Sequence, residues 1–185
     1  RLSKEGNLSF ISKNGHFVKL NKDVYDSCLK HDEVCLEVEE QYQKFKELAN
    51  RKPDYMEGHA LLHTVYLKAI EVVAKKHNVL FIPSLIHHDD ALMIKEIPLY
   101  FWMESMSDNY HPMQCFQKIC SNRREGCEVM ILHPGYIDTY LCENSSLLKA
   151  REMEVEFIMH LDNIVSDKDN IEFVTYKDFV RGVKF

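Results

Sequence analysis

The chain has 185 residues, of which 45% are hydrophobic and 28% are charged, as expected of a soluble globular protein with a real core. Its net charge of −6 argues against nucleic acid or an anionic membrane as a partner. The sequence contains no apolar stretch long enough to span a bilayer. It shows no signal peptide, but it starts with Arg1, so we expect the native start to lie upstream.

The spacing of apolar residues predicts an alternation of helices and strands. In chain order, we predict a helix over residues 32–49, a strand over 55–58, a helix over 64–77, a strand over 79–83, a partly extended stretch over 92–101, a helix over 112–124, a strand over 128–132, a helix over 145–165 and a strand over 171–176. Asp32 and Ser145 are the expected N-caps of the first and last helices. This alternation favours an α/β fold built from parallel β-α-β units.

Six cysteines are spaced irregularly along the chain, and none forms a Cys-x-x-Cys pair. This spacing favours free, partly buried thiols over a disulfide framework or a zinc–cysteine site. Free thiols are typical of a reducing compartment, so we expect a cytoplasmic protein.

Two of the predicted strands lead directly into a histidine. His59 follows the strand over residues 55–58, and His133 follows the strand over 128–132. In parallel α/β folds the chemistry takes place at the carboxyl ends of the strands. We therefore predict that His59 and His133 open on the same rim of the sheet.

The first candidate motif runs from Glu57 to His63 and contains His59 and His63, four residues apart. Histidines at this spacing can share one face of a helix and bind one metal ion. A pair of ordinary surface or capping histidines is an equally good interpretation of the residues alone.

The second candidate motif runs from His133 to Asp138. Pro134 favours an extended conformation at His133, and Gly135 permits a tight turn. Imidazole titrates near neutral pH and is suited to proton transfer. A structural turn with a solvent-facing histidine explains the residues equally well.

Three further segments favour structural interpretations. After Ser145, the helix that carries Arg151 and either Glu152 or Glu154 is expected to present a solvated, charged face. The His-His-Asp-Asp run at residues 87–90 is expected to be a solvated loop, with a small chance of binding a metal. The aromatic residues 100–102 can stack on a sugar, but core packing is favoured for them.

These segments occur in the order found in the YdjC-like carbohydrate deacetylases, which this chain resembles over nearly its whole length. That family carries a D-G-H-x-H-x-H or D-S-H-H-H-x-H motif, then H-P-G-Y-x-D, and then S-S-x-x-x-x-R-x-x-E. Here the corresponding segments are residues 57–63, 133–138 and 145–152. Glu57 replaces the family's aspartate and Leu61 its middle histidine. The family's opening N-A-D-D-x-G and later H-x-x-L-T motifs, which supply metal ligands and a carboxylate, do not occur in this sequence.

The resemblance implies a metal-dependent hydrolase that removes acetyl groups from N-acetylated sugars such as chito-oligosaccharides. It implies a distorted β/α barrel of the glycoside hydrolase/deacetylase type, here a single partial domain over residues 1–185 that lacks its first strands. A divalent ion, Mg or Zn, is expected on His59 and His63, and His133 is expected to protonate the leaving amine. Asp138 and Arg151 are expected to orient or support the site.

The expected partner is a carbohydrate substrate, and a homodimer is expected, with neither nucleic acid nor a membrane as a partner. With two predicted metal ligands, this chain alone is expected to bind metal weakly and not to deacetylate sugars, because the family takes its other ligands from the motifs that do not occur here. Two alternatives stay open. One is a non-catalytic or truncated relative that binds sugar or a partner chain, and the other is a different α/β metallohydrolase such as a phosphoesterase.

Overall fold

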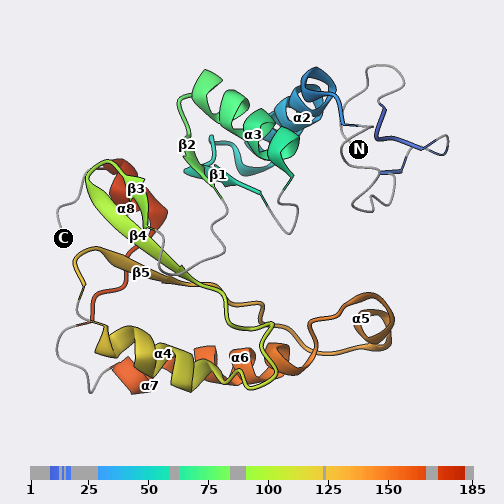
Figure 1. Ribbon diagram of the computed structural model, residues 1–185. Coiled ribbons are helices and arrows are strands. Elements are labelled where there is room, and N and C mark those ends of the chain that lie inside the picture. The colour runs from blue at the N-terminus through green and yellow to red at the C-terminus, as the bar shows by residue number, and fades with distance from the viewer. Residues whose placement is uncertain are drawn as a thin grey trace. The chain divides into compact units, whose positions relative to one another are not determined.

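A computed structural model describes residues 9–12, 14, 16–17, 29–58, 63–83, 91–122, 124–165 and 171–181. The chain divides into two compact units (Figure 1), of which unit 1 is Arg1–Ser84 with Thr175–Phe185 and unit 2 is Leu85–Val174. One domain can contain two such units, so the expectation of a single domain stays a prediction.

Unit 1 contains two packed helices and a short parallel sheet (Figure 1), together with a third, short helix. Its elements are α2 (His31–Ala49), β1 (Tyr55–Glu57), α3 (Thr64–Lys76), β2 (Leu80–Ile82) and α8 (Tyr176–Arg181). Strands β1 and β2 pair in parallel, with Met56 opposite Phe81. The unit therefore contains the β-α-β arrangement that the sequence predicts, with α3 as the crossover helix.

The core of unit 1 lies between α2 and α3. The residues that form it recur at helical spacing, and they are Val34, Val38, Tyr42, Ala69, Ile70 and Val73, with Phe10 from the preceding segment. Residues three or four apart share one face of a helix, so each helix presents an apolar stripe to the other. This pairing explains why the predictions of helices over residues 32–49 and 64–77 are confirmed to within a residue.

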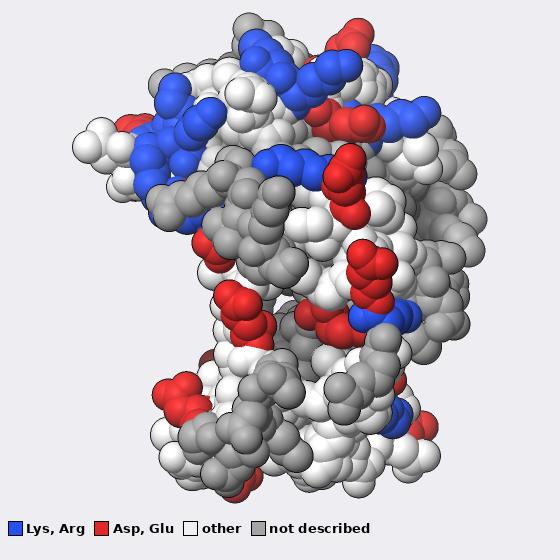
Figure 2. Space-filling model, turned by 90° about the vertical axis from the view of Figure 1, so that its left-hand side faces the viewer, with Lys and Arg blue, Asp and Glu red and all other residues white. Residues whose placement is uncertain are grey.

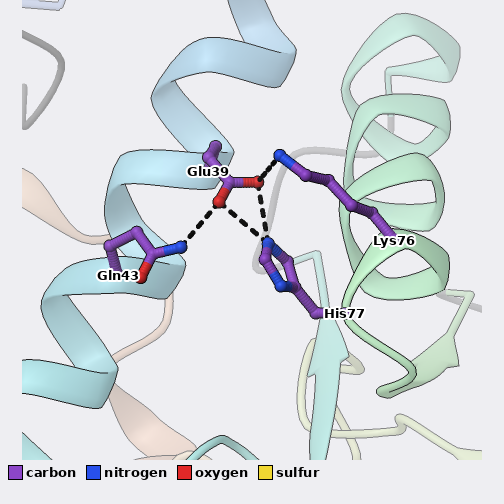
Figure 3. A network of polar contacts seen from close by, with 4 residues as sticks. All are labelled: Glu39, Gln43, Lys76 and His77. Carbon is purple, nitrogen blue, oxygen red and sulfur yellow. Dashed lines mark hydrogen bonds and ion pairs between the residues drawn. The ribbon is translucent and has the colours of Figure 1, made fainter.

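A carboxylate joins the two helices at the edge of this core (Figure 3). Glu39 of α2 accepts hydrogen bonds from Gln43, 2.7 Å, and from Lys76, 3.0 Å, and its oxygens lie 2.8 and 2.9 Å from Nε2 of His77. The His77 ring stacks on Tyr42 with 3.9 Å between centroids. Burial alone raises the pKa of Glu39, but the hydrogen bonds from Gln43, His77 and Lys76 outweigh it and lower the pKa to about 2.

The ends of α2 and α3 depend on local backbone chemistry. Asn50 ends α2 with φ of 50°, and Asn78 follows α3 with φ of 51°. Asparagine tolerates this left-handed conformation better than most residues, so it suits these positions. The prediction that Asp32 caps α2 is wrong, because the helix begins one residue earlier and its N-cap is Lys30, without a side-chain cap. Asp32 instead lies in the first turn, where it complements the helix dipole.

Unit 2 is a three-stranded mixed sheet with helices beside it (Figure 1). Its elements are β3 (Ala91–Ile94), β4 (Ile97–Trp102), α4 (Pro112–Ser121), β5 (Cys127–Met130), α5 (Thr139–Asn144), α6 (Lys149–Met159) and α7 (Leu161–Val165). The strand order is β3-β4-β5, in which β3 is antiparallel and β5 is parallel to β4. Helix α4 packs on α6, with 5.6 Å between the ring centroids of Phe116 and Phe157.

The parallel pairing of β4 and β5 depends on a glycine. Gly126, immediately before β5, has φ of 118°, and a Cβ atom there would collide with the carbonyl oxygen of Pro98 at the start of β4. Only glycine adopts this conformation without strain and permits so close an approach. Further along the pair, Glu128 of β5 accepts hydrogen bonds from the Trp102 indole and from Arg124, 2.7 Å. The Trp102 contact ties β5 to β4, and the Arg124 contact ties β5 to the chain that precedes it.

Several predicted elements differ from the structure. The predicted helix over residues 145–165 is divided into α6 and α7 at His160, and Ser145 closes α5 as its C-cap rather than opening α6. The predicted strand over residues 171–176 is wrong, since residues 171–175 have no regular structure and α8 begins at Tyr176. The all-parallel arrangement is wrong for β3, which forms a hairpin with β4. The distorted barrel stays a prediction.

Charged side chains of both signs occur on the surface of the described residues (Figure 2). On the face shown in Figure 2, Lys and Arg side chains lie among Asp and Glu side chains. Among the described helices, none combines the length and the apolar character needed to cross a bilayer. None of the described cysteines forms a disulfide, and these residues are Cys35, Cys115, Cys120, Cys127 and Cys142.

Candidate functional site

The candidate site in unit 2 lies where the chain leaves the parallel strands β4 and β5. The backbone N–H of Ile131 donates to the carbonyl of Trp102, 2.8 Å, so the two strands stay together to their ends. Beyond them the chain runs to the same side in Figure 1. This brings Ser105, three residues after β4, to His133, three residues after β5, with 3.1 Å between Oγ and Nδ1. The carboxyl ends of adjacent parallel strands thus deliver both side chains to one place.

The His133 imidazole has one nitrogen engaged and one available. Ser105, which is only 5% exposed, can donate to or accept from Nδ1, and in either case it fixes the orientation of the ring. The buried hydroxyl therefore orients the ring, and Nε2 is left without a partner among the described residues.

The backbone of His133 is held by two side chains of α6. A carboxylate oxygen of Glu154 accepts a hydrogen bond from the His133 N–H, and Nη1 of Arg151 donates to the His133 carbonyl, 3.3 Å. Arg151 and Glu154 are three residues apart and share one face of the helix. Arg151 is itself positioned by a 2.7 Å bond from Nε to the Leu147 carbonyl. We refer to Arg151 and Glu154 as the helical clamp.

The inner end of the helical clamp is buried and incompletely hydrogen-bonded. Glu154 is 0% exposed. Its second oxygen and the Tyr110 hydroxyl make no hydrogen bond of regular geometry with a described residue, although the two groups lie close enough to interact. Burial, together with the neighbouring Glu154 carboxylate, raises the pKa of Tyr110 well above its ordinary value. Burial likewise raises the pKa of Cys115 to about 11. The carboxylate of Glu154 thus lies in a poorly hydrated environment, which is costly for a charged group.

Exposed apolar side chains lie near Ser105 and His133 in sequence, on the chain segments that follow β4 and β5. Tyr136 is 73% exposed and Tyr140 is 70% exposed on the chain beyond β5, and Met103 and Met106 are exposed on the chain beyond β4. Large apolar groups held in solvent beside a polar site are typical of ligand-contacting surfaces. By contrast, Trp102 and Phe101 are buried, as the core-packing interpretation predicts.

Two residues of the H-P-G-Y-x-D segment have local structural roles. Asp138 is the N-cap of α5, where its Oδ1 accepts a hydrogen bond from the Leu141 N–H, 2.8 Å. The backbone N–H of Gly135 donates to the Arg151 carbonyl, 3.4 Å. A Cβ atom at Gly135 would meet Arg151 only at ordinary contact distance, 3.5 Å. The turn therefore does not need a glycine here, contrary to the interpretation of the sequence.

The predicted metal ligands are only partly within the described residues. His63 is the N-cap of α3, and its Nδ1 accepts a hydrogen bond from the Val65 N–H, 3.2 Å, so a metal contact would have to use Nε2. His59 and residues 87–90 lie outside the described ranges. Within those ranges, no three His, Cys, Asp or Glu side chains come together as a metal site. The shared rim of His59 and His133 stays a prediction, because His59 lies outside the described ranges and the two residues belong to different units.

Sequence reasoning identified His133 and Arg151 but did not identify three of their neighbours. Glu154 was expected on a solvated face, which is wrong for this residue and right for Glu152, which is exposed. A signal was present, because the R-x-x-E spacing of the family pattern, counted from Arg151, ends at Glu154. Ser105 and Tyr110 had no such signal, since they lie in an irregular loop without a recognisable motif.

The fold and the site define an α/β protein with a histidine-centred polar site at the ends of parallel strands. Residues 1–163 match the family of YdjC-like proteins, and the chain belongs to that family. It is 24% identical over 182 residues to Carbohydrate deacetylase 2 of Listeria innocua, covering 92% of this chain and 69% of that protein. It is 23% identical over 180 residues to Carbohydrate deacetylase of Clostridium beijerinckii, covering 92% of this chain and 70% of that protein.

A solved structure shares the fold. The crystal structure of a proposed cellobiose-phosphate cleavage protein from Enterococcus faecalis V583 matches with a TM-score of 0.57 and 16% identity, covering 92% of this chain and 68% of that chain. This likeness extends the family assignment from sequence to architecture and confirms the mixed α/β class.

Proposed function

We propose that this protein is a hydrolase that removes acetyl groups from an N-acetylated sugar, and that His133 moves the proton at the departing nitrogen. The observation that carries the proposal is the fixation of His133, with Nδ1 on Ser105 and its backbone in the helical clamp, while Nε2 has no described partner. Curated relatives named carbohydrate deacetylases support the reaction class.

The chemistry of amide hydrolysis matches what such a histidine offers. Water adds to the acetyl carbon, the bond from carbon to nitrogen breaks, and the nitrogen must gain a proton to leave as an amine. A protonated imidazole can deliver that proton from Nε2 and be reprotonated near neutral pH. The Nδ1 contact with Ser105 keeps the ring in place during the transfer.

The sugar part of the proposal rests on the exposed tyrosines. Tyr136 and Tyr140 lie on the loop and short helix that follow His133 in the chain. Aromatic rings present an apolar face and a polar tip, which suits the mixed surface of a pyranose ring. N-acetylated chito-oligosaccharides, expected from the family resemblance, combine such rings with the amide that the proposed reaction needs.

A divalent ion, Mg or Zn, is part of the proposal through His59 and His63. When bound, such an ion polarises the amide carbonyl and activates water. A calorimetric metal titration of the protein and of His63→Ala tests this part separately from activity. We expect weak binding, reduced further in the variant, because two imidazoles supply fewer than the about three protein ligands usual at a catalytic site. Unchanged binding in His63→Ala would remove this residue from the proposed ligand set.

The reaction is tested in the full-length protein by acetate release from an N-acetylated chito-disaccharide, with phosphate release from a sugar phosphate measured in parallel. In His133→Ala we expect kcat to fall about a hundredfold or more with little change in KM, as for the loss of a proton donor. The matched control is His111→Ala, because His111 is an exposed histidine of the same unit whose side chain makes no cap bond. Near-normal turnover in His133→Ala would contradict the proposed role, and phosphate release without acetate release would contradict the reaction class.

A further inference from the structure

We infer that Glu154 is a positioning residue for His133, whose buried carboxylate fixes the peptide group from which the imidazole projects. The inference rests on the proposed role of His133 in proton transfer. It concerns the hydrogen bond from the His133 N–H to Oε2 of Glu154, because that contact reaches the backbone and leaves both ring nitrogens for other partners.

The burial of Glu154 is difficult to explain by stability alone. Its neighbours include Tyr110 and Cys115, which belong to a cluster of buried apolar side chains in unit 2. An apolar residue in such surroundings packs without any cost of desolvation, whereas a fully buried carboxylate loses its hydration there. Buried polar groups that are incompletely satisfied are typical of functional sites.

The helical clamp and Ser105 together constrain His133 at three points. Glu154 holds the N–H, Arg151 holds the carbonyl, and Ser105 holds Nδ1 of the ring. Two of these contacts come from one face of α6, so they move together with the helix. Because backbone and ring are fixed independently, the position of Nε2 relative to the substrate depends on both, and a displaced peptide moves the ring as well.

The role requires a hydrogen-bond acceptor at the correct reach rather than a negative charge. Glu154→Gln keeps a carbonyl oxygen at the same distance from the helix, whereas Glu154→Asp withdraws the acceptor by about 1.5 Å, one carbon–carbon bond. A misplacement of about 1 Å in a catalytic group can lower a rate about a hundredfold. We therefore expect kcat for acetate release within about threefold of wild type in the Gln variant, and about a hundredfold lower in the Asp variant, with KM little changed in both.

The matched control is Glu152→Gln, because Glu152 is exposed on the same helix and two residues away. It should leave kcat unchanged. Wild-type kcat in Glu154→Asp would overturn the inference. An equal loss of kcat in Glu154→Gln and Glu154→Asp would also overturn it, because the charge of the acceptor and not its distance from the helix would then determine kcat. Arg151→Lys, which shortens the other arm of the clamp, should lower kcat in the same way, and an unaffected kcat there would exclude a clamp of two residues.

A readout independent of activity keeps the inference testable if the Asp variant does not fold. The His133 amide proton, bonded to a carboxylate in the wild type, should resonate at lower chemical shift in Glu154→Gln, because a neutral acceptor bonds it more weakly. An unchanged amide resonance would show that the bond is absent in solution and would overturn the inference. Normal activity in His133→Ala together with a shifted amide would contradict the proposed function and leave the structural contact established, so the two failures are distinguishable.

Discussion

His77 in unit 1 and His133 in unit 2 are held in opposite ways. The His77 ring is engaged through Nε2, which lies against both oxygens of Glu39 (Figure 3), and through its stacking on Tyr42. In His133 the backbone is held by Glu154 and Arg151 and Nδ1 by Ser105, and Nε2 has no partner among the described residues. One histidine uses its side chain to join two helices, and the other is supported so that its side chain is available.

The carboxylates beside the two histidines also differ, both in their exposure and in their hydrogen bonding. Glu39 is partly exposed and accepts bonds from three side chains, which is the arrangement expected where an ion pair stabilises a fold. Glu154 is buried, and one of its oxygens makes no hydrogen bond of regular geometry with a described residue, which costs stability. Both pairs consist of a glutamate and a histidine, so residue type does not distinguish them. The extent to which the carboxylate oxygens are hydrogen-bonded does distinguish the structural pair from the candidate functional one.

The largest expected effect comes from disturbing the backbone that delivers His133. Gly126→Ala should lower the free energy of unfolding by about 3 kcal/mol, because alanine at φ of 118° is strained and its Cβ collides with Pro98. Urea denaturation measures this change. The control is Gly135→Ala, which fits at ordinary contact distance and should change stability by less than about 0.5 kcal/mol. Equal losses in both variants would mean that the β4–β5 pairing does not depend on Gly126.

A smaller effect should come from removing the charge beside His77. The pKa of Glu39 is about 2 in the folded protein against an ordinary value of 4.5, so the charged carboxylate favours the folded state. Its contribution is fully present above about pH 4.5 and is lost as the pH falls towards 2. We expect Glu39→Gln to be less stable by about 1 kcal/mol at neutral pH.

Urea titrations of the wild type and Glu39→Gln across pH 2–7 should show that difference shrinking below pH 4.5 and vanishing near pH 2. Comparing the two proteins removes the contribution of other carboxylates, which titrate in both. A difference that stays constant down to pH 2 would exclude Glu39 as the titrating group.

The smallest effect concerns the surface beside His133. Tyr136→Ala should raise KM for an N-acetylated chito-disaccharide about fivefold, the equivalent of about 1 kcal/mol of aromatic contact, with kcat retained. Tyr136→Phe should behave as the wild type, because the ring and not the hydroxyl makes the contact. Since Tyr136 is 73% exposed, the free energy of unfolding should change by less than about 0.5 kcal/mol. A KM unaffected by Tyr136→Ala would place the sugar elsewhere.

The elements that the sequence predicts correctly are those whose apolar pattern is strong and local. Helices α2 and α3 carry a repeated apolar stripe, and their bounds agree with expectation. The long helix predicted over residues 145–165 fails because the same pattern continues through His160, where α6 ends and α7 begins without any glycine or proline to mark the break. The β3–β4 hairpin was not predicted, since its turn at Lys95 and Glu96 lacks the usual turn residues.

The candidate site likewise has a part that the sequence predicts and a part that it does not. His133 was predicted because it follows a buried strand and precedes Pro134, which is a local signal. Its contact with Ser105 joins residues 28 positions apart, and no spacing rule connects a loop after one strand with a loop after another. The burial of Glu154 depends on which face α6 turns to α4, which is decided by packing and not by the sequence of the helix itself.

The clamp also has an evolutionary consequence. Glu154 and Arg151 form hydrogen bonds with the peptide groups of residue 133 and not with its ring. These bonds therefore do not depend on which side chain that residue carries. A descendant of this protein can exchange the histidine for another reactive group without rebuilding the scaffold that presents it. Chemistry and architecture can thus be inherited separately at this position, and a change of reaction would need fewer simultaneous mutations here than at a site whose side chains hold one another.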